Sequence, residues 1–170
     1  MMFPMRAAVL AALLAACASG AGAQSPSPFG GFRHDSTQPI EIAADSLEVR
    51  EGEKVAVFRG GVVAGQGTLR LTAEELKVDY GDGGAGEGQI RRLEARGKVF
   101  IANEAETAAG EFAEYDVAAG RIRMTGAVTL TQGGNVVKGE ALSINLDSGE
   151  GRIDGGGGRV KSVFTPAPAD

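Results

Sequence analysis

The stretch Arg121-Ile122-Arg123-Met124-Thr125-Gly126-Ala127-Val128-Thr129-Leu130 decides the fold class of this 170-residue chain. Apolar side chains and one Gly occupy the even positions, whereas Arg, Thr and one Ala occupy the odd positions. Because side chains alternate between the two faces of a strand, this pattern predicts a β-strand with one apolar face and one face in water. The same parity recurs from Leu93 to Ile101, interrupted only by Phe100 on the polar face.

Two anchor motifs recur and divide the chain into about four units. The first anchor is an acidic residue ahead of an alternating stretch, and it occurs in steps of 29, 37 and 29 residues at Asp45, Glu74, Glu111 and Glu140. The second is a Gly inside an expected strand, in steps of 37, 29 and 29 residues, at Gly60, Gly97, Gly126 and Gly155. Both long steps span 81–88, and deleting those eight residues restores the period of 29. The chain therefore reads as copies of one supersecondary unit with one expanded turn.

The strand parity slips at the first anchor. Leu69 and Leu71 share a face with Ala73, but the next apolar set begins at Leu76, three residues later. A bulge or bend there returns the apolar side to the same interior. The glycines of the second anchor allow a strand to fold sharply without a Cβ clash. We expect an all-β jelly-roll or flattened spiral of sheet with two facing layers rather than a closed barrel.

The N-terminus has the pattern of a secretory signal peptide over residues 1–23. A ten-residue apolar stretch, 7–16, follows Arg6, and Ala21-Gly22-Ala23 fits a small-x-small cleavage site. Ten apolar residues are too few for a transmembrane helix, which needs about 20. Leu14-Ala15-Ala16-Cys17 resembles a lipobox, so cleavage before Cys17 and a lipid anchor stay open. Cys17 is the only cysteine, so no intramolecular disulfide is available.

Composition divides the remainder of the chain. Residues 24–38 are rich in Ser, Pro and Gly and are expected to be a mobile lead-in. Residues 39–164 hold the repeats and form the expected β domain, and 165–170 form a short tail. Without the leader the chain has 16 basic and 22 acidic residues. An acidic chain does not favour nucleic acid, whose affinity comes mainly from neutralised phosphates.

The short motifs in the sequence favour no catalytic, cofactor or metal site, so we expect no enzyme activity. Gly81, Gly83 and Gly86 satisfy G-x-G-x-x-G, but no helix follows them. Asp79 and Asp82 lack the recurrence of a calcium-binding β-roll. The glycines at 155–158 lack the Lys-Ser/Thr of a phosphate-binding loop. His34 is the only histidine and lies in the lead-in.

The apolar stripe has two interpretations. In any β-sandwich this face is the core, but recurrent Ala and Gly at inward positions, with seven Phe, two Tyr and no Trp, can leave room for a groove. Strand parity assigns these inward positions to Ile42, Leu47, Val49, Phe58, Val62, Leu69, Leu71, Leu76, Val78, Leu93, Val99, Ile101, Tyr115, Ile122, Met124, Val128, Leu130, Leu142, Ile144 and Leu146.

Several of these stretches resemble the LptA/OstA family. The N-terminal match lies in 39–48 and in Phe58-Arg59-Gly60-Gly61-Val62, and the later matches lie in 110–116 and 130–139. The resemblance covers about 39–153, and the loop 81–88 and the Gly-rich stretch near 155 depart from it. It implies a twisted antiparallel β jelly-roll with open ends in the periplasm. It also implies that the inward positions bind the acyl chains of lipopolysaccharide.

The resemblance further implies a set of partners. These are lipopolysaccharide, other copies of the chain in head-to-tail contact, the inner-membrane export complex and the outer-membrane translocon. We expect the segments 40–49 and 140–147 to be exposed sheet edges that serve such contacts. A basic cluster, Arg91, Arg92, Arg96 and Lys98, either meets lipid phosphates at the groove mouth or is ordinary strand solvation.

The function that the resemblance implies is a carrier or bridge that moves lipopolysaccharide from the inner to the outer membrane through an apolar groove. Two alternatives to this carrier stay open. One is a membrane-associated LptC-like partner of the same export system, against which the short leader argues. The other is a structural β module of the envelope with a filled core.

Overall fold

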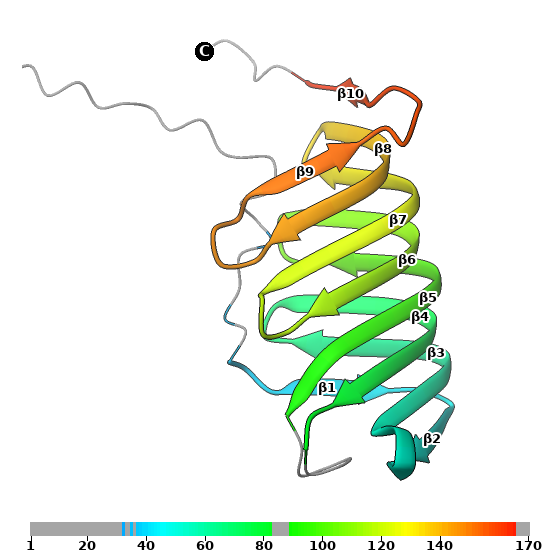
Figure 1. Cartoon of the computed structure of the whole chain (residues 1–170). Helices are drawn as coiled ribbons and strands as arrows, with labels where there is room; N and C mark the ends of the chain where they lie inside the picture. The colour runs from blue at the N-terminus through cyan, green and yellow to red at the C-terminus, as the bar shows by residue number, and fades with distance from the viewer. Residues whose placement is uncertain (1–31, 33–34, 36, 83–88, 166–170) are drawn as a thin grey trace, which may run out of the picture.

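The computed structural model describes residues 32, 35, 37–82 and 89–165. Within these residues the chain forms ten strands and the short 3₁₀ helix η2, Glu51–Glu53 (Figure 1). The strands are β1 (Ile40–Ala43), β2 (Ser46–Arg50), β3 (Val55–Gln66), β4 (Leu69–Tyr80), β5 (Ile90–Ala102), β6 (Glu106–Asp116), β7 (Arg121–Gln132), β8 (Asn135–Asn145), β9 (Gly151–Asp154) and β10 (Lys161–Val163). The predicted signal peptide, Cys17, His34, the loop residues 83–88 and 166–170 lie outside the described residues.

The strands form one antiparallel sheet that is folded over into two facing half-sheets. The order is β1-β3-β4-β5-β6-β7-β8-β10, with β2 also on β3 and β9 also on β8. The long strands β3 to β8 run through both layers, as Figure 1 shows. Half-sheet I contains β2, β9 and the segments 55–59, 75–79, 92–96, 112–116, 121–125 and 141–145. Half-sheet II contains β1, β10 and the segments 62–66, 69–72, 99–102, 106–109, 128–132 and 135–139. The expected antiparallel jelly-roll is therefore confirmed.

Each long strand turns from one half-sheet to the other at a corner, where the pairing register shifts. The shifts fall at the predicted anchors, for example between Arg59 and Val62 and between Thr125 and Val128. Gly60, Gly97 and Gly126 have φ of 81°, 77° and 87° at these corners. Side chains strongly disfavour this left-handed region, whereas Gly adopts it freely. The predicted bends and the role of these glycines are confirmed.

The two anchors meet in space, which explains why they repeat together. A Cβ on Gly126 would lie 2.6 Å from the Cβ of Glu111, and Gly60 and Gly97 contact Asp45 and Glu74 in the same way. The recurrent acids thus cover the corner glycines of neighbouring strands. Gly155 departs from the prediction because β9 ends at Asp154, so Gly155 lies in the loop before β10 instead of inside a strand.

The sheet edges lie at the two ends of the structure. Segment 40–49 spans β1 and most of β2, which are edge strands as predicted. The prediction for 140–147 is wrong, because Ala141–Ile144 pair with β9 and are covered by it. The edges at that end are β9 and β10 instead. β9 has only four residues and lies among several glycines, so the alternation of apolar and polar residues does not reveal it.

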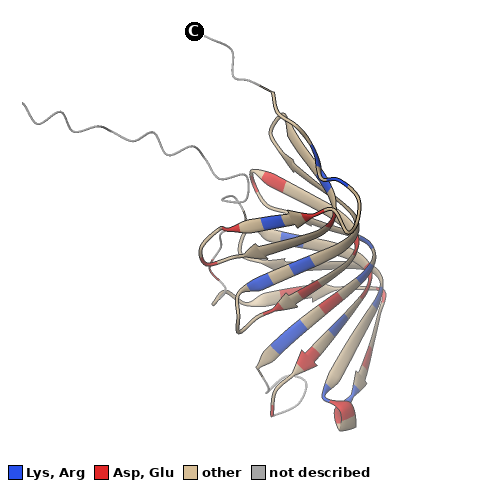
Figure 2. Cartoon of the chain, turned by 45° about the horizontal axis from the view of Figure 1, so that its top comes forward, with Lys and Arg blue, Asp and Glu red and all other residues tan. Residues whose placement is uncertain are grey.

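The outer faces of the half-sheets differ in charge. Acidic and basic residues alternate across half-sheet I (Figure 2), and the pairs Arg59–Glu75 and Arg92–Glu114 form ion pairs there. On half-sheet II the outward row runs through Val63, Thr72, Phe100, Ala109 and Thr129 and carries no charge before Lys138, and Val63 is 44% exposed and Phe100 41% exposed. The exposure of Phe100 agrees with its place on the polar face of the sequence pattern.

One residue of the lead-in is part of the core. Phe32 is 0% exposed and belongs to the same hydrophobic cluster as the inward residues of both half-sheets. The expectation of a mobile lead-in is therefore wrong at this position. The physical reason is that the small inward residues leave room for a large side chain, and burying one aromatic ring stabilises the fold by about 2 kcal/mol.

The corner geometry makes a stability prediction. We expect Gly126→Ala to lower the free energy of unfolding by about 3 kcal/mol, because it adds both a strained φ and an overlap with Glu111. Gly133→Ala is the matched control, since Gly133 has a positive φ of 54° and no neighbour within 4 Å. It should cost about 1 kcal/mol. Urea unfolding measures both, and equal losses would contradict the corner contact.

The burial of Phe32 makes a second prediction. Phe32→Ala should lower the free energy of unfolding by about 3 kcal/mol, because it deletes a fully buried ring. Phe164→Ala removes the same side chain from a site that is 61% exposed and should change stability by less than about 0.5 kcal/mol. Thermal and urea unfolding compare the two variants. A cost at Phe32 no larger than that at Phe164 would show that the lead-in does not contribute to the core.

Candidate functional site

The facing sides of the two half-sheets enclose one apolar interior. Most of the predicted inward residues are buried there, at 8% exposure or less. They are Val62, Leu69, Leu76, Val78, Leu93, Val99, Ile101, Tyr115, Ile122, Met124, Val128, Leu130, Leu142, Ile144 and Leu146. Ile42, Phe58 and Leu71 are partly buried against the same cluster. The strand parity in the sequence therefore identified the lining of the interior.

Leu47 and Val49 differ from the other predicted lining residues in their exposure. They pair with Phe58 and Ala56, so they lie on the inward face, yet they are 55% and 44% exposed. Both belong to β2, beyond which half-sheet I has no further strand. The apolar interior therefore reaches the surface at the end formed by β1 and β2.

Small residues form a further part of the lining, besides the inward positions named in the sequence analysis. Ala64, Ala73, Ala95, Ala108 and Ala113 are buried among the larger side chains. Gly110 lies against Met124, and a Cβ there would come within 2.8 Å of that side chain.

A cavity of about 40 Å³ remains in the interior. It lies between both half-sheets, near β1 and the turn between β3 and β4. Its lining consists of Ile40, Ala64, Gly65, Gln66, Leu69, Leu71, Leu93, Ile101, Ala113, Tyr115 and Ile122. A buried water needs roughly 10–15 Å³ of such space, so the cavity has room for only a few atoms. This cavity is thus far too small for an acyl chain.

Gln66 and Tyr115 are the two residues of this lining with polar side chains. The Tyr115 hydroxyl donates to Oε1 of Gln66 at 3.2 Å, and Nε2 of Gln66 donates to the backbone carbonyl of Gln38 at 2.9 Å. Gln66 is 5% exposed and Tyr115 is 8% exposed. Burial, followed by the nearby carboxylates of Asp147 and Asp116, raises the pKa of Tyr115 to about 12. The hydroxyl therefore stays protonated and can donate at physiological pH.

A second buried polar contact lies in half-sheet II. Glu106 is 1% exposed, and its Oε1 accepts a hydrogen bond of 2.6 Å from Nε2 of Gln132. Its backbone N–H donates to the side chain of Asn103 in the preceding turn. Sequence reasoning singled out neither Gln66 nor Glu106.

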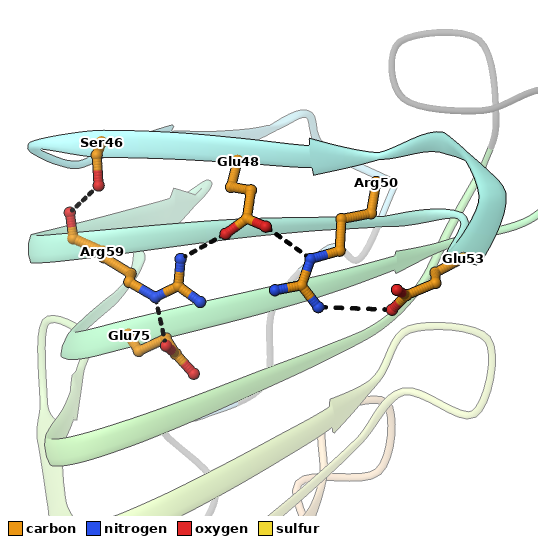
Figure 3. Close-up of polar contacts among 6 residues, drawn as sticks. All are labelled: Ser46, Glu48, Arg50, Glu53, Arg59 and Glu75. Carbon is orange, nitrogen blue, oxygen red and sulfur yellow. Dashed lines mark hydrogen bonds and ion pairs between the residues drawn. The ribbon is translucent and has the colours of Figure 1, made fainter.

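An ion-pair network holds the exposed strand β2 on its outer face (Figure 3). Glu48 accepts hydrogen bonds from Arg50 at 2.8 Å and from Arg59 at 2.9 Å, and Arg59 also contacts Glu75 at 2.8 Å. The hydrogen bond from Arg50, followed by that from Arg59, lowers the pKa of Glu48 to about 2. Glu48 therefore remains ionised, and the network links the edge strand to β3 and β4.

The structure does not gather the predicted basic cluster at an opening of the interior. Arg92 and Arg96 lie on the outer face of half-sheet I, where Arg92 pairs with Glu114 and Arg96 stacks over Phe112 at 5.1 Å. Lys98 lies at a corner and pairs with Glu74 at 2.7 Å. Each of these charges has a neighbouring acid or ring, which agrees with ordinary strand solvation.

Two kinds of feature are absent from the described residues. No helix in this part of the chain is both long and apolar enough to cross a membrane. Among the same residues, no group of three or more His, Cys, Asp or Glu side chains is arranged to hold a metal ion.

Comparisons with known proteins agree on one family. Residues 41–150 match the family described as LptA/(LptD N-terminal domain) LPS transport protein. The chain is 36% identical over 173 residues to the uncharacterized protein R00383 of Rhizobium meliloti (strain 1021), covering 97% of this chain and 93% of that protein. It is 28% identical over 141 residues to the lipopolysaccharide export system protein LptH of Pseudomonas aeruginosa, covering 79% of this chain and 77% of LptH.

A solved structure shares the fold. The crystal structure of LptH, the LptA-homologous periplasmic component of the lipopolysaccharide transport device of Pseudomonas aeruginosa, superposes with a TM-score of 0.67. The match covers 78% of this chain and 99% of that structure at 24% identity. The family match extends over more than half of the chain and includes every strand from β3 to β8. The chain therefore belongs to the LptA/LptD N-terminal domain family of lipopolysaccharide transport proteins.

Proposed function

We propose that this protein is a periplasmic carrier that holds the acyl chains of lipopolysaccharide between its two half-sheets and passes the lipid from the inner toward the outer membrane. The main support is the continuous apolar interior, which reaches the surface at Leu47 and Val49. The predicted signal peptide and the periplasmic LptH support the location. The proposal assigns no catalytic residue and no cofactor to the chain.

The energetics explain why such a carrier is needed. Each CH₂ exposed to water costs about 0.8 kcal/mol, so one twelve-carbon chain costs on the order of 10 kcal/mol. A lipid with several such chains would leave a membrane extremely slowly. An apolar interior removes most of that cost. Because the chain has an excess of acidic residues, acyl chains rather than phosphates would supply the attraction.

The ends of the jelly-roll support end-to-end assembly with other jelly-roll domains. Edge strands leave backbone N–H and C=O groups unpaired, which a second copy can continue as sheet. At one end Leu47 and Val49 expose apolar surface, and at the other Val163 and Phe164 are 65% and 61% exposed. Joining the two ends would extend the interior from one copy into the next. The inner-membrane export complex and the outer-membrane translocon are the proposed partners at the ends of such a bridge.

The small size of the interior cavity favours one alternative, a structural β module of the envelope that carries no lipid. In that case the cavity of about 40 Å³ would be an ordinary packing defect. The carrier proposal requires the interior to widen, and the alternative requires it to stay closed. Lipid capture from the interior distinguishes the two.

Photo-crosslinking tests the carrier directly. A photoreactive residue in place of Val99, which is 1% exposed and points inward, should capture lipopolysaccharide in cells or with purified lipid. The matched control is the next residue, Phe100, which points outward on the same strand. We expect lipid adducts at Val99 and at the equally buried Val128, and few at Phe100. Equal labelling inside and outside, or none inside, would favour the filled module.

Self-association tests the role of the open end. We expect Leu47→Glu to weaken assembly by at least tenfold in dissociation constant, because it places a charge in an apolar contact. Phe100→Glu adds the same charge to an exposed apolar site away from the ends. Sedimentation velocity over a range of concentrations measures both. If the two variants assemble equally well, the end formed by β1 and β2 is not the contact surface.

A further inference from the structure

The space between the half-sheets is closed in different ways on its two long sides. On one side the strands themselves run continuously around the corners at Gly60, Gly97 and Gly126. On the other side the strands end in turns, and each turn joins two strands of the same half-sheet. No strand therefore crosses from one half-sheet to the other on this side. Any widening of the interior therefore has the corners as its hinge and this turn side as its opening.

A hydrogen bond between side chains spans that turn side. Gln66 is the last residue of β3 in half-sheet II, directly before the turn to β4. Tyr115 lies one residue from the end of β6 in half-sheet I, and its hydroxyl reaches Gln66 at 3.2 Å. Gln66 also holds the backbone of Gln38, just ahead of β1, at 2.9 Å. The three residues thus tie half-sheet I, half-sheet II and the segment before β1 together.

The same two side chains lie in the wall of the cavity. Both Gln66 and Tyr115 line it, and Ile40 of β1 lies beside them. The rest of that lining consists of apolar side chains and Gly65, so these two side chains supply its only polar groups. The cavity of about 40 Å³ holds no acyl chain unless this wall moves. We propose that the Gln66–Tyr115 hydrogen bond is a latch across the lateral opening and that acyl chains enter where it opens.

The chemistry of the pair suits a latch that opens at modest cost. A buried hydrogen bond between neutral groups contributes little net stability, but its partners must find new ones when it breaks. The amide of Gln66 offers two donors and an acceptor, and Tyr115 offers a hydroxyl. The ester, amide and hydroxyl groups near the base of acyl chains in a glycolipid offer the complementary acceptors and donors. The latch inference rests on the proposed carrier function, but its opening can be measured without lipid.

Removing one hydroxyl tests the latch. Tyr115→Phe keeps the ring and deletes the donor, so it should bind dansyl-aminoundecanoic acid about two- to tenfold more tightly, the equivalent of one net hydrogen bond. Tyr80→Phe removes the hydroxyl of the other tyrosine, which is half-buried and for which we find no hydrogen bond in the described part of the chain. It should leave the affinity unchanged. Unchanged or weaker binding by Tyr115→Phe, with normal thermal unfolding, would overturn the latch.

Locking the opening gives the converse test. In a Cys17→Ser background, Gln66→Cys and Tyr115→Cys are joined by a reducible bis-methanethiosulfonate linker. We expect the joined protein to lose probe binding and to regain it on reduction. Equal binding in the joined and reduced forms would contradict entry at this side.

Hydrogen exchange separates the latch from the carrier proposal. In Tyr115→Phe without lipid, the amides of β1 and the end of β3 should exchange at least threefold faster than in the wild type, while those around Val128 should not change. Unchanged exchange at β1 would overturn the latch even if the protein binds lipid. Faster exchange in a protein that binds neither the probe nor lipopolysaccharide would support the latch and reject the carrier.

Discussion

The whole structure depends on the close contact between a left-handed glycine and the acidic side chain that covers it. Gly60, Gly97 and Gly126 let the alternate strands β3, β5 and β7 turn at positive φ without a Cβ, and Asp45, Glu74 and Glu111 pack directly over them. Because every long strand turns at the same level, one continuous sheet becomes two facing layers. The interior exists because of this alignment, and it needs no loop or helix to close it on the corner side.

Alignment of the corners also fixes which residues face inward. A register shift at each corner moves the side-chain parity by one, so the apolar set before the bend and the set after it both point into the interior. Leu71 and Leu76 lie on either side of such a bend in β4 and face the same cluster. This is why alternation read from the sequence predicted the lining well, including the slip at the acidic anchors.

Sequence reasoning failed where long-range packing outweighs local pattern. The lead-in has the composition of a mobile segment, yet Phe32 is buried because Ala and Gly in distant strands leave room for its ring. Strand β9 follows a turn and precedes four glycines, so its pairing with β8 was not visible and the edge was placed one strand too early. Leu47 and Val49 have the correct parity, but parity does not state where a sheet ends. The bond between Gln66 and Tyr115 joins residues 49 positions apart and has no local signal.

The carrier proposed above must reconcile two opposing demands. A folded protein needs a packed core, since each buried void weakens it, whereas a carrier needs space for a ligand that is present only part of the time. Small residues in the sheets combined with a large ring from outside the sheets meet both demands. Phe32 supplies packing to the free protein from a segment whose removal would not break any strand pairing of the sheet. If the proposed carrier opens on the turn side, the corners at Gly60, Gly97 and Gly126 would keep the two layers facing each other.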